Sequence, residues 1–150
     1  MTLSPNFTLS EGIKSQAAIR LGIENDPPLE VLARMKHTAN AILEPVRAHF
    51  KVPFAPTSFY RSIPLNRAIG SKDTSQHTKG EAVDIEVPGV SNYALACWIR
   101  DNLEYDQLIL ENYKPGQPSS GWVHVAVKDK WNRKETLTFT GKEYLPGLVA

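Results

Sequence analysis

The sequence predicts an α+β fold: a small antiparallel sheet with helices packed on one face and a polar cleft on the other. Three segments carry this prediction, because each alternates in its side chains with a period of two. They are Ala82–Val87, Gln107–Glu111 and Trp122–Val127. Residues two apart share one face of a strand, so each segment has one Val, Ile or Leu face to bury and a second, partly polar face. Segments with helical periodicity lie before and between them.

Two helices are expected ahead of this sheet. The first is a short helix within Pro5–Ile23, with Ser10 and Glu11 as its expected cap. The second begins after Asp26-Pro27-Pro28, where a capping carboxylate precedes prolines in the first turn. Pro45 is expected to kink this helix or to end it early. Its apolar residues recur at mostly three- and four-residue steps, as on a buried helix face: Leu32, Met35, Ala39, Ile42, Leu43 and Val46.

The segments around the three strands are less regular. Thr57–Arg61 is predicted to be a short strand, Ile63–Ile69 a turn or short helix, and Gly70–Gly80 a polar loop. Leu137–Thr140 is predicted to add an edge strand. A further helix between the first two strands is capped by Ser91 and carries the apolar residues Leu95, Trp98, Ile99 and Leu103.

The composition places limits on the function. The chain has 150 residues, which fits a single domain over residues 1–150, and a formal net charge of +1, which does not favour a nucleic-acid partner. Its one cysteine, Cys97, excludes an internal disulfide. No apolar segment is long enough for a membrane span, and Met1–Glu11 lacks the features of a signal peptide. We therefore expect synthesis in the cytoplasm and no membrane insertion.

The polar residues most suggestive of chemistry are His77, Asp84 and His124. His77 closes the polar loop, and Gly80 permits a tight turn that brings His77 back toward Asp84 in the next strand. His124 lies on a strand whose polar face is expected to border the same cleft. Imidazole nitrogen and carboxylate oxygen are good zinc ligands, and three protein ligands leave a fourth position for water. The pattern therefore predicts a catalytic metal site.

The residues around this triad resemble a known family. The pattern Ser75-x-His77-x-x-Gly80-x-Ala82-x-Asp84, followed by Trp122-Val123-His124, resembles the zinc D-Ala-D-Ala carboxypeptidase family, which includes phage endolysin L-Ala-D-Glu peptidases. Further segments similar to that group are Asn6-Phe7-Thr8 with Ser10-Glu11, Gly22-Ile23-Glu24-Asn25 with Pro27, and Ser58-Phe59-Tyr60-Arg61-Ser62 with Leu65-Asn66. The combination is specific, and the resemblance covers most of the chain.

The resemblance implies that His77, Asp84 and His124 hold Zn²⁺ and that a carboxylate base lies near the metal. Many relatives carry an acidic residue three positions before the last histidine, but Gly121 stands there in this chain. Glu111 is the candidate base, since it ends a strand whose face borders the expected cleft. Glu81 and Glu86 are the rival bases, and an ordinary surface carboxylate is the alternative for Glu111.

Three further residues are candidates for substrate binding. The resemblance suggests that Arg61 grips a substrate carboxylate, a task that suits a guanidinium fork, although a surface ion pair is the alternative. Trp122 either lines the cleft or covers the edge of the sheet. Ser75 is expected to shape the loop rather than act as a nucleophile, because no activating base is evident beside it. Asp106 and Gln107 either orient the ligands or only lead into their strand, and His37 and His49 are expected to lie outside the site.

These observations indicate a zinc metallopeptidase that hydrolyses peptidoglycan stem peptides, either as a D-Ala-D-Ala carboxypeptidase or as an L-Ala-D-Glu endopeptidase. By analogy with the endolysins, we expect a monomer that acts on the cell wall, in the periplasm, once it is released. The alternative is a catalytically inactive, zinc-stabilised module that binds peptidoglycan or belongs to a phage structure. The missing acid at position 121 favours that alternative.

Overall fold

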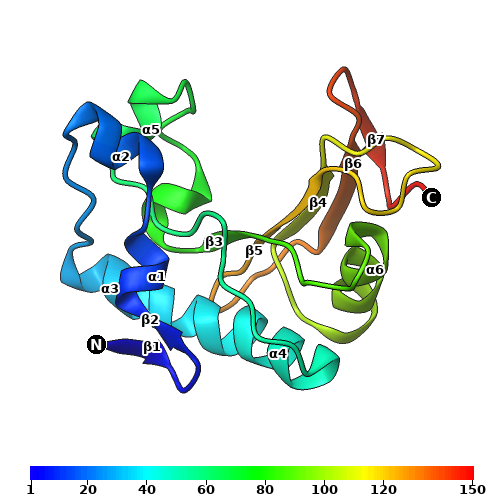
Figure 1. Ribbon diagram of the computed structural model, residues 1–150, viewed down its shortest axis with the longest axis horizontal. Coiled ribbons are helices and arrows are strands. Elements are labelled where there is room, and N and C mark those ends of the chain that lie inside the picture. The colour runs from blue at the N-terminus through cyan, green and yellow to red at the C-terminus, as the bar shows by residue number, and fades with distance from the viewer.

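A computed structural model describes all of residues 1–150 and confirms the α+β class. Its main feature is a five-stranded sheet with the strand order β3-β5-β4-β6-β7 (Figure 1). A two-stranded hairpin, β1 (Thr2–Ser4) with β2 (Phe7–Thr8), lies apart from it at the N-terminus. The strands of the large sheet are β3 (Ala82–Ile85), β4 (Gln107–Glu111), β5 (Trp122–Ala126), β6 (Glu135–Phe139) and β7 (Tyr144–Pro146).

The sheet is antiparallel except between β4 and β6, which run parallel. After β5 the chain crosses to the far side of β4. The next strand, β6, therefore pairs with β4 and runs parallel to it, in the direction opposite to β5. The prediction of an edge strand at Leu137–Thr140 was wrong in this respect, because β6 has a partner on each side and β7 forms the edge. The crossing is a long-range event that the local pattern does not reveal.

The other regular elements of the chain are helices. They are α1 (Leu9–Ile13), α2 (Gln16–Leu21), α3 (Leu29–Thr38), α4 (Glu44–Phe50), α5 (Ile63–Ala68) and α6 (Asn92–Asn102), with a π-helical turn, η1 (Ala39–Leu43), and a 3₁₀ turn, η2 (Gln76–Lys79). Figure 1 shows α1, α2 and α5 at one end of the molecule and β6 and β7 at the other. None of these helices has the length and apolar character of a membrane span.

The caps of the first two predicted helices differ from expectation. Thr8, not Ser10, caps α1, and it forms a capping box in which Glu11 accepts a hydrogen bond from the Thr8 backbone. Asp26 does not cap α3, whose N-cap is Pro28 with no side-chain hydrogen bond. In both cases the predicted cap lies two positions from the actual N-cap, a distance over which a sequence pattern has little power to choose.

The helix that contains Pro45 neither ends early nor stays purely α-helical. The turn η1 joins α3 to α4, and the Glu44 N–H donates to the Ala39 carbonyl five residues earlier. Pro45 follows as the second residue of α4. Because proline lacks the N–H that an α-helical bond requires, one wider turn before it lets the helix continue to Phe50.

The hydrophobic core lies between the helices and the apolar face of the sheet. α6 packs on β4 and β5 and contributes Leu95 and Ile99, both fully buried. The long helix contributes Met35, Ile42 and Leu43 to the same cluster. The strands contribute Val83, Ile85, Leu108, Leu110, Val123 and Val125, which are the residues that the alternating pattern assigned to the buried face. The opposite face is thereby left for the polar residues.

The predicted strand at Thr57–Arg61 is reduced to one isolated bridge between Ser58 and Asp84. The chain leaves the sheet edge after this bridge, because the Tyr60 N–H donates to Gly12 and the Arg61 N–H donates to the His77 carbonyl. These contacts place the segment between the N-terminal helices and the loop that carries His77. The segment is therefore a connector beside the cleft rather than a sixth strand.

Candidate metal centre and active site

His77 is held by the short turn η2. The Ser75 hydroxyl accepts a hydrogen bond from the His77 N–H and caps the turn, and Gly80 ends it in the left-handed region at φ 74°. A Cβ at Gly80 would lie 2.7 Å from Met35 Cγ and 2.8 Å from the Val31 carbonyl oxygen, so this position admits only glycine. The predicted role of Gly80 in turning the loop is thus reinforced by its contact with α3.

The ring of His77 has a fixed orientation. Its Nδ1 lies 2.7 Å from the Phe59 carbonyl oxygen, which can only accept, so Nδ1 carries the proton. Nε2 therefore has a free lone pair, and it lies 3.4 Å from Asp84 Oδ1. The side chain is almost completely buried. A second contact that fixes the tautomer in this way is typical of histidines that bind metals.

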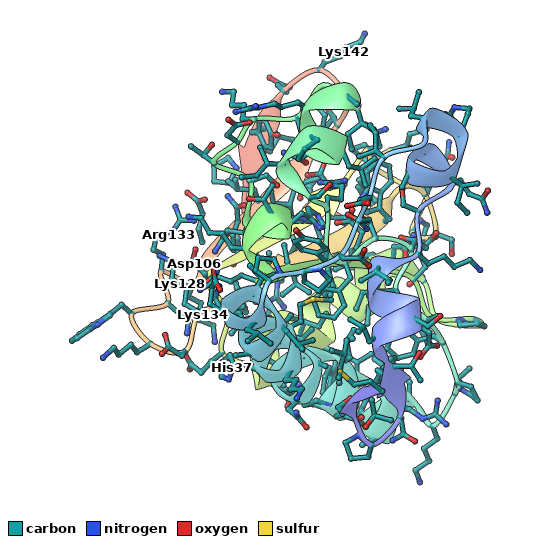
Figure 2. All side chains as sticks on the ribbon, turned by 90° about the vertical axis from the view of Figure 1, so that its left-hand side faces the viewer. His37, Asp106, Lys128, Arg133, Lys134 and Lys142 are labelled. Atoms are coloured by element: carbon teal, nitrogen blue, oxygen red, sulfur yellow. The ribbon has the colours of Figure 1, made fainter.

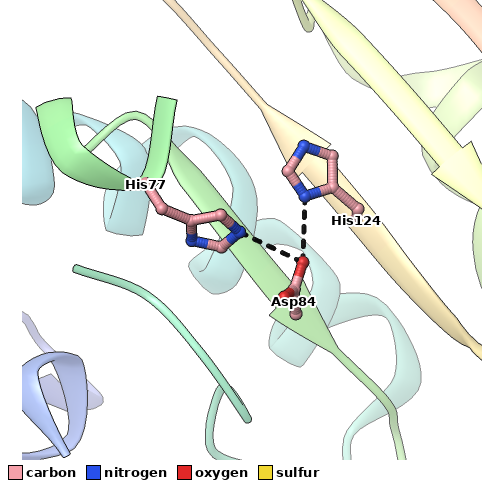
Figure 3. A group of neighbouring side chains, drawn as sticks. All are labelled: His77, Asp84 and His124. Atoms are coloured by element: carbon pink, nitrogen blue, oxygen red, sulfur yellow. Dashed lines mark hydrogen bonds and ion pairs between the residues drawn. The ribbon is translucent and has the colours of Figure 1, made fainter. Parts of the chain in front are cut away.

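Asp84 and His124 are brought together by the register of the sheet. They are paired residues on β3 and β5, and His124 Nδ1 lies 2.9 Å from Asp84 Oδ1. Figure 3 shows both imidazole rings directed at this carboxylate, His77 from η2 and His124 from β5. The three ligand atoms lie within 4.8 Å of one another. The structure thus brings together all three residues that the sequence assigned to the metal.

The spacing of these atoms fits a zinc ion. Zinc bonds of about 2.0–2.2 Å at tetrahedral angles would separate neighbouring ligand atoms by about 3.3–3.6 Å. The 3.4 Å between His77 Nε2 and Asp84 Oδ1 lies in this range, and the 2.9 Å between His124 and Asp84 is a hydrogen bond that a small movement would open. Two imidazoles and one carboxylate also form a donor set that zinc uses in catalytic sites.

The protonation states of His77 and Asp84 are those required for binding a metal. Burial lowers the pKa of His77 against the opposing effect of Asp84, and the nearby His124 and Arg61 lower it further. Burial would raise the pKa of Asp84, but its interactions with His77 and His124 outweigh burial and lower it. At neutral pH the site therefore offers a neutral imidazole of His77 and an ionised carboxylate, the forms that bind a metal.

Glu111 shares a cleft of about 550 Å³ with the three ligands. It is paired with Trp122, and Ile109, two residues before it, is paired with His124, so Glu111 and His124 are diagonal neighbours on one face. Burial raises the pKa of Glu111, the charge of His124 partly offsets this, and Asp84 adds to it. A half-buried carboxylate with a raised pKa is suited to accept and return a proton.

The rival bases lie outside this cleft. Glu86 is exposed and accepts a hydrogen bond from Asn92, and Glu81 borders a separate hollow together with Arg34 and His37. Apart from Asp84, Glu111 is the only carboxylate that lines the cleft. The geometry therefore selects Glu111 among the three candidates.

Gly121 explains why this chain departs from the family pattern at that position. It has φ 66°, and a Cβ built on it would lie 1.8 Å from the Glu111 carbonyl oxygen. The close approach of the two backbones leaves no room for an acidic side chain at position 121. The carboxylate instead comes from Glu111, on the strand that Gly121 approaches.

Arg61 lines the cleft without being part of an ion pair. Its side chain is partly buried, its Nε has no hydrogen-bond partner, and burial lowers its pKa while Asp84 opposes this effect. A surface ion pair, the alternative considered for Arg61, is absent. An unused guanidinium beside the metal ligands is available for a substrate carboxylate.

The other predicted site residues divide into two groups. Trp122 and Ser75 line the cleft, and Ser75 also caps η2, as expected of a residue that shapes the loop. Asp106 does not orient the metal ligands, because its carboxylate binds Arg133 and Lys128. His37 and His49 lie outside the cleft, His49 stacked on Trp98 at 4.5 Å.

Sequence reasoning missed several residues of the cleft, among them Lys72, Arg133 and Tyr144. None of them belongs to a motif. Arg133 and Tyr144 flank β6, whose parallel pairing with β4 brings them to the cleft. Only the order of the strands, which local patterns do not contain, could have pointed to them.

Comparison with known proteins agrees with this geometry. A search of curated proteins finds no match to the chain. The sequence model of the family described as Peptidase M15 matches residues 5–126, which include His77, Asp84, Glu111 and His124. Members of this family are metallopeptidases and are typically zinc-dependent, in accord with the two histidines and one aspartate gathered here. With residues 5–126 of its 150 residues matched, the chain belongs to the Peptidase M15 family.

Proposed function

We propose that this protein is a zinc-dependent peptidase that hydrolyses the stem peptides of peptidoglycan. The observation that carries the proposal is the group of His77, Asp84 and His124 in one cleft with Glu111, a carboxylate of raised pKa. This combination supplies a metal site and a proton acceptor on the same face of the sheet, which metal-assisted hydrolysis requires. Membership of the M15 family supports the same reaction class.

The residues of the cleft divide the chemical work. When bound, zinc supplies Lewis acidity that polarises the scissile carbonyl and acidifies water. Glu111 accepts the proton of the attacking water, which its raised pKa favours, and returns it to the leaving amine. Arg61 binds a carboxylate of the peptide, and Trp122 provides a flat apolar wall opposite Glu111 on the adjacent strand.

The bond that is cut is either the terminal D-Ala-D-Ala bond or the L-Ala-D-Glu bond, and the biological setting of the proposal is lysis by a phage or prophage. In that setting the chain acts as a monomer on the wall, in the periplasm, after its release from the cytoplasm.

The test is digestion of purified peptidoglycan with zinc-loaded protein and with a chelated control, followed by mass spectrometry of the fragments. We expect new chelator-sensitive termini. Loss of a single D-Ala would identify a carboxypeptidase, and a free D-Glu amine would identify an endopeptidase. Cleavage that survives complete removal of the metal would contradict the proposal.

The second candidate function is an inactive zinc-stabilised binding module, favoured by the absence of an acid at position 121. Glu111 in the same cleft removes the basis of that argument, since the carboxylate is supplied from β4. The two functions differ in one experiment. Wild-type protein that binds wall fragments and zinc but releases no new termini would support the module.

A further inference from the structure

A second polar cluster lies at the beginning of β4, at one end of the cleft. Its centre is Asp106, whose side chain is fully buried. Asp106 accepts hydrogen bonds from the Arg133 backbone N–H at 3.0 Å, from Arg133 Nε at 3.1 Å and from Arg133 Nη2 at 2.9 Å. Lys128 Nζ lies 3.6 Å away. Figure 2 shows Asp106, Arg133 and Lys128 side by side on one flank of the molecule.

The cluster holds Arg133 in one orientation. Burial acts to raise the pKa of Asp106, but the hydrogen bonds and charge of Arg133 and the charge of Lys128 lower it to about 2. The carboxylate therefore stays ionised at neutral pH, and its two oxygens grip the fork of the guanidinium. Because the Arg133 side chain is already held in one orientation, it loses little conformational freedom when it binds a ligand.

Part of the guanidinium remains free. Nη1 has no hydrogen-bond partner, and its nearest carboxylate, Glu135 Oε1, is 3.8 Å away. That carboxylate is already engaged by Gln107 Nε2 at 2.6 Å. The Arg133 side chain is about half exposed, at 53%, and it lines the cleft that contains the metal ligands. Arg133 thus presents an oriented guanidinium edge, whose Nη1 has no hydrogen-bond partner, to a ligand in the cleft.

The register of the sheet gives its distance from the metal centre. Arg133 Nη1 lies 3.8 Å from Glu135 Oε1, which accepts a hydrogen bond from Gln107, whereas His124 is paired with Ile109, two residues further along β4. Two residues of a strand span about 7 Å. Two residues of an extended peptide lying along the strand span the same distance. A group on the substrate about two residues from the cut bond would therefore reach Arg133.

We infer that Arg133, oriented by Asp106, is a specificity-determining residue that binds a free carboxylate of the stem peptide about two residues from the scissile bond. This inference rests on the proposed function. It assigns to Asp106 a positioning role and distinguishes Arg133 from Arg61, which lies on the other side of the metal ligands, in the segment that follows the bridge to β3. The substrates it selects are stem peptides that are not amidated at that carboxylate.

The test uses pairs of synthetic stem peptides that differ only in whether one carboxylate is free or amidated, with the position of the amide varied along the stem. Zinc-loaded wild-type protein is expected to prefer the free acid by roughly tenfold or more in kcat/KM at the position about two residues from the cut, because a charge-assisted hydrogen bond is lost. The difference is expected mainly in KM. Equal rates for both members of every pair would overturn the inference.

Variants then assign this preference to a residue. Arg133→Gln is expected to bring the ratio of the two rates close to one, and Asp106→Asn to lower it in wild-type protein but to add nothing in the Arg133→Gln background. Arg100→Gln is the matched control, since Arg100 pairs with Asp101 on α6, away from the cleft. Retention of the wild-type ratio in Arg133→Gln would contradict the inference.

A stability measurement separates the effects of these variants on folding from their effects on substrate preference. Thermal unfolding is measured for each variant, and the double variant D106N/R133Q removes the buried charge together with its partner, so it replaces Arg133→Gln if that variant unfolds. If wild-type protein cuts no stem peptide, the proposed function fails. Calorimetric binding of the same peptide pairs would then decide the Arg133 inference, which requires tighter binding of the free acid.

Discussion

Asp84 and Asp106 are both aspartates with nearly buried side chains beside the same cleft, and the pKa of each lies below its usual range. Their partners differ. Asp84 faces two imidazoles, and the pKa of His77 is itself lowered. Asp106 faces a guanidinium, which is protonated at every physiological pH, together with Lys128.

This difference distinguishes Asp84, whose charge is available to a bound cation, from Asp106, whose charge is paired within the protein. A buried negative charge is costly unless a cation lies beside it. The charge of Asp106 is compensated by two cations of the chain, whereas Asp84 has only imidazoles beside it, which leaves its charge available to a bound cation. Glu111, the other carboxylate that lines the cleft, takes part in no ion pair, and burial raises its pKa.

The largest expected effect is on catalysis, at Glu111. Glu111→Gln is expected to lower the rate of peptide hydrolysis by roughly 10²–10⁴-fold, because the amide cannot accept a proton. Zinc binding should persist, since Glu111 is not one of the three ligands. Hydrolysis assays combined with metal analysis of the same samples check both statements.

The pH dependence of hydrolysis sharpens this result. Below its pKa Glu111 is protonated and cannot act as a base, so kcat/KM should fall as the pH decreases through a pKa above the usual glutamate range. Glu111→Gln should lack this acid limb. If the variant keeps near wild-type rates, the base lies elsewhere and the contrast among the three carboxylates loses its catalytic meaning.

The second effect concerns metal affinity and compares the two aspartates directly. Asp84→Asn is expected to weaken zinc binding by at least about 100-fold, because loss of a ligand costs at least as much as loss of an outer hydrogen-bond partner. Asp106→Asn is expected to leave zinc affinity within about twofold of wild type, since Asp106 contacts no ligand. Competition with a chelator measures both constants.

A matching loss of zinc affinity in both variants would mean that the two clusters are coupled. Thermal unfolding with and without zinc provides the control. Zinc at about 100 times its dissociation constant should stabilise the wild type and Asp106→Asn by roughly 3 kcal/mol, and Asp84→Asn by much less.

The third effect is on stability, at Gly121. Gly121→Ala is expected to lower the free energy of unfolding by about 2–3 kcal/mol, because the new Cβ would force β5 away from the Glu111 backbone. Gly22→Ala is the matched control, with the same φ of 66° and nothing within 4 Å of its Cβ. Its cost should be about 1 kcal/mol, from backbone strain alone.

Urea unfolding of the two glycine variants measures this difference. An equal cost for both would show that the approach of Gly121 to Glu111 contributes nothing beyond the left-handed backbone. A larger cost at Gly121, together with reduced hydrolysis, would show that this contact also holds Glu111 in place beside the metal ligands.

The smallest effect is the acid stability contributed by Asp106. Its pKa is lowered to about 2 in the folded protein, so its contribution is present above the unfolded pKa near 4 and is lost as the pH falls toward about 2. We expect roughly 1–2 kcal/mol, reduced because Arg133 is half exposed. Wild type should lose this amount relative to Asp106→Asn between about pH 4 and pH 2, measured by urea unfolding at each pH; a constant difference would contradict the assignment.

The sequence by itself identified the two faces of the strands and the three candidate metal-binding residues. Val83, Ile85 and Val125 alternate with Asp84 and His124 at a period of two, and this period alone assigns one set to the core and the other to the cleft. The spacing of His77, Gly80 and Asp84 is also local, because a single turn joins them. Such features depend on neighbouring residues only, so a pattern contains them.

The tertiary structure alone decided which distant segments meet. The selection of Glu111 over Glu81 and Glu86 depends on the pairing of β4 with β5, and the place of Arg133 depends on the crossover that sets β6 beside β4. The exclusion of an acid at position 121 depends on a backbone contact between Gly121 and Glu111. Each of these results from long-range packing, where many residues together set a position that no short stretch of sequence specifies.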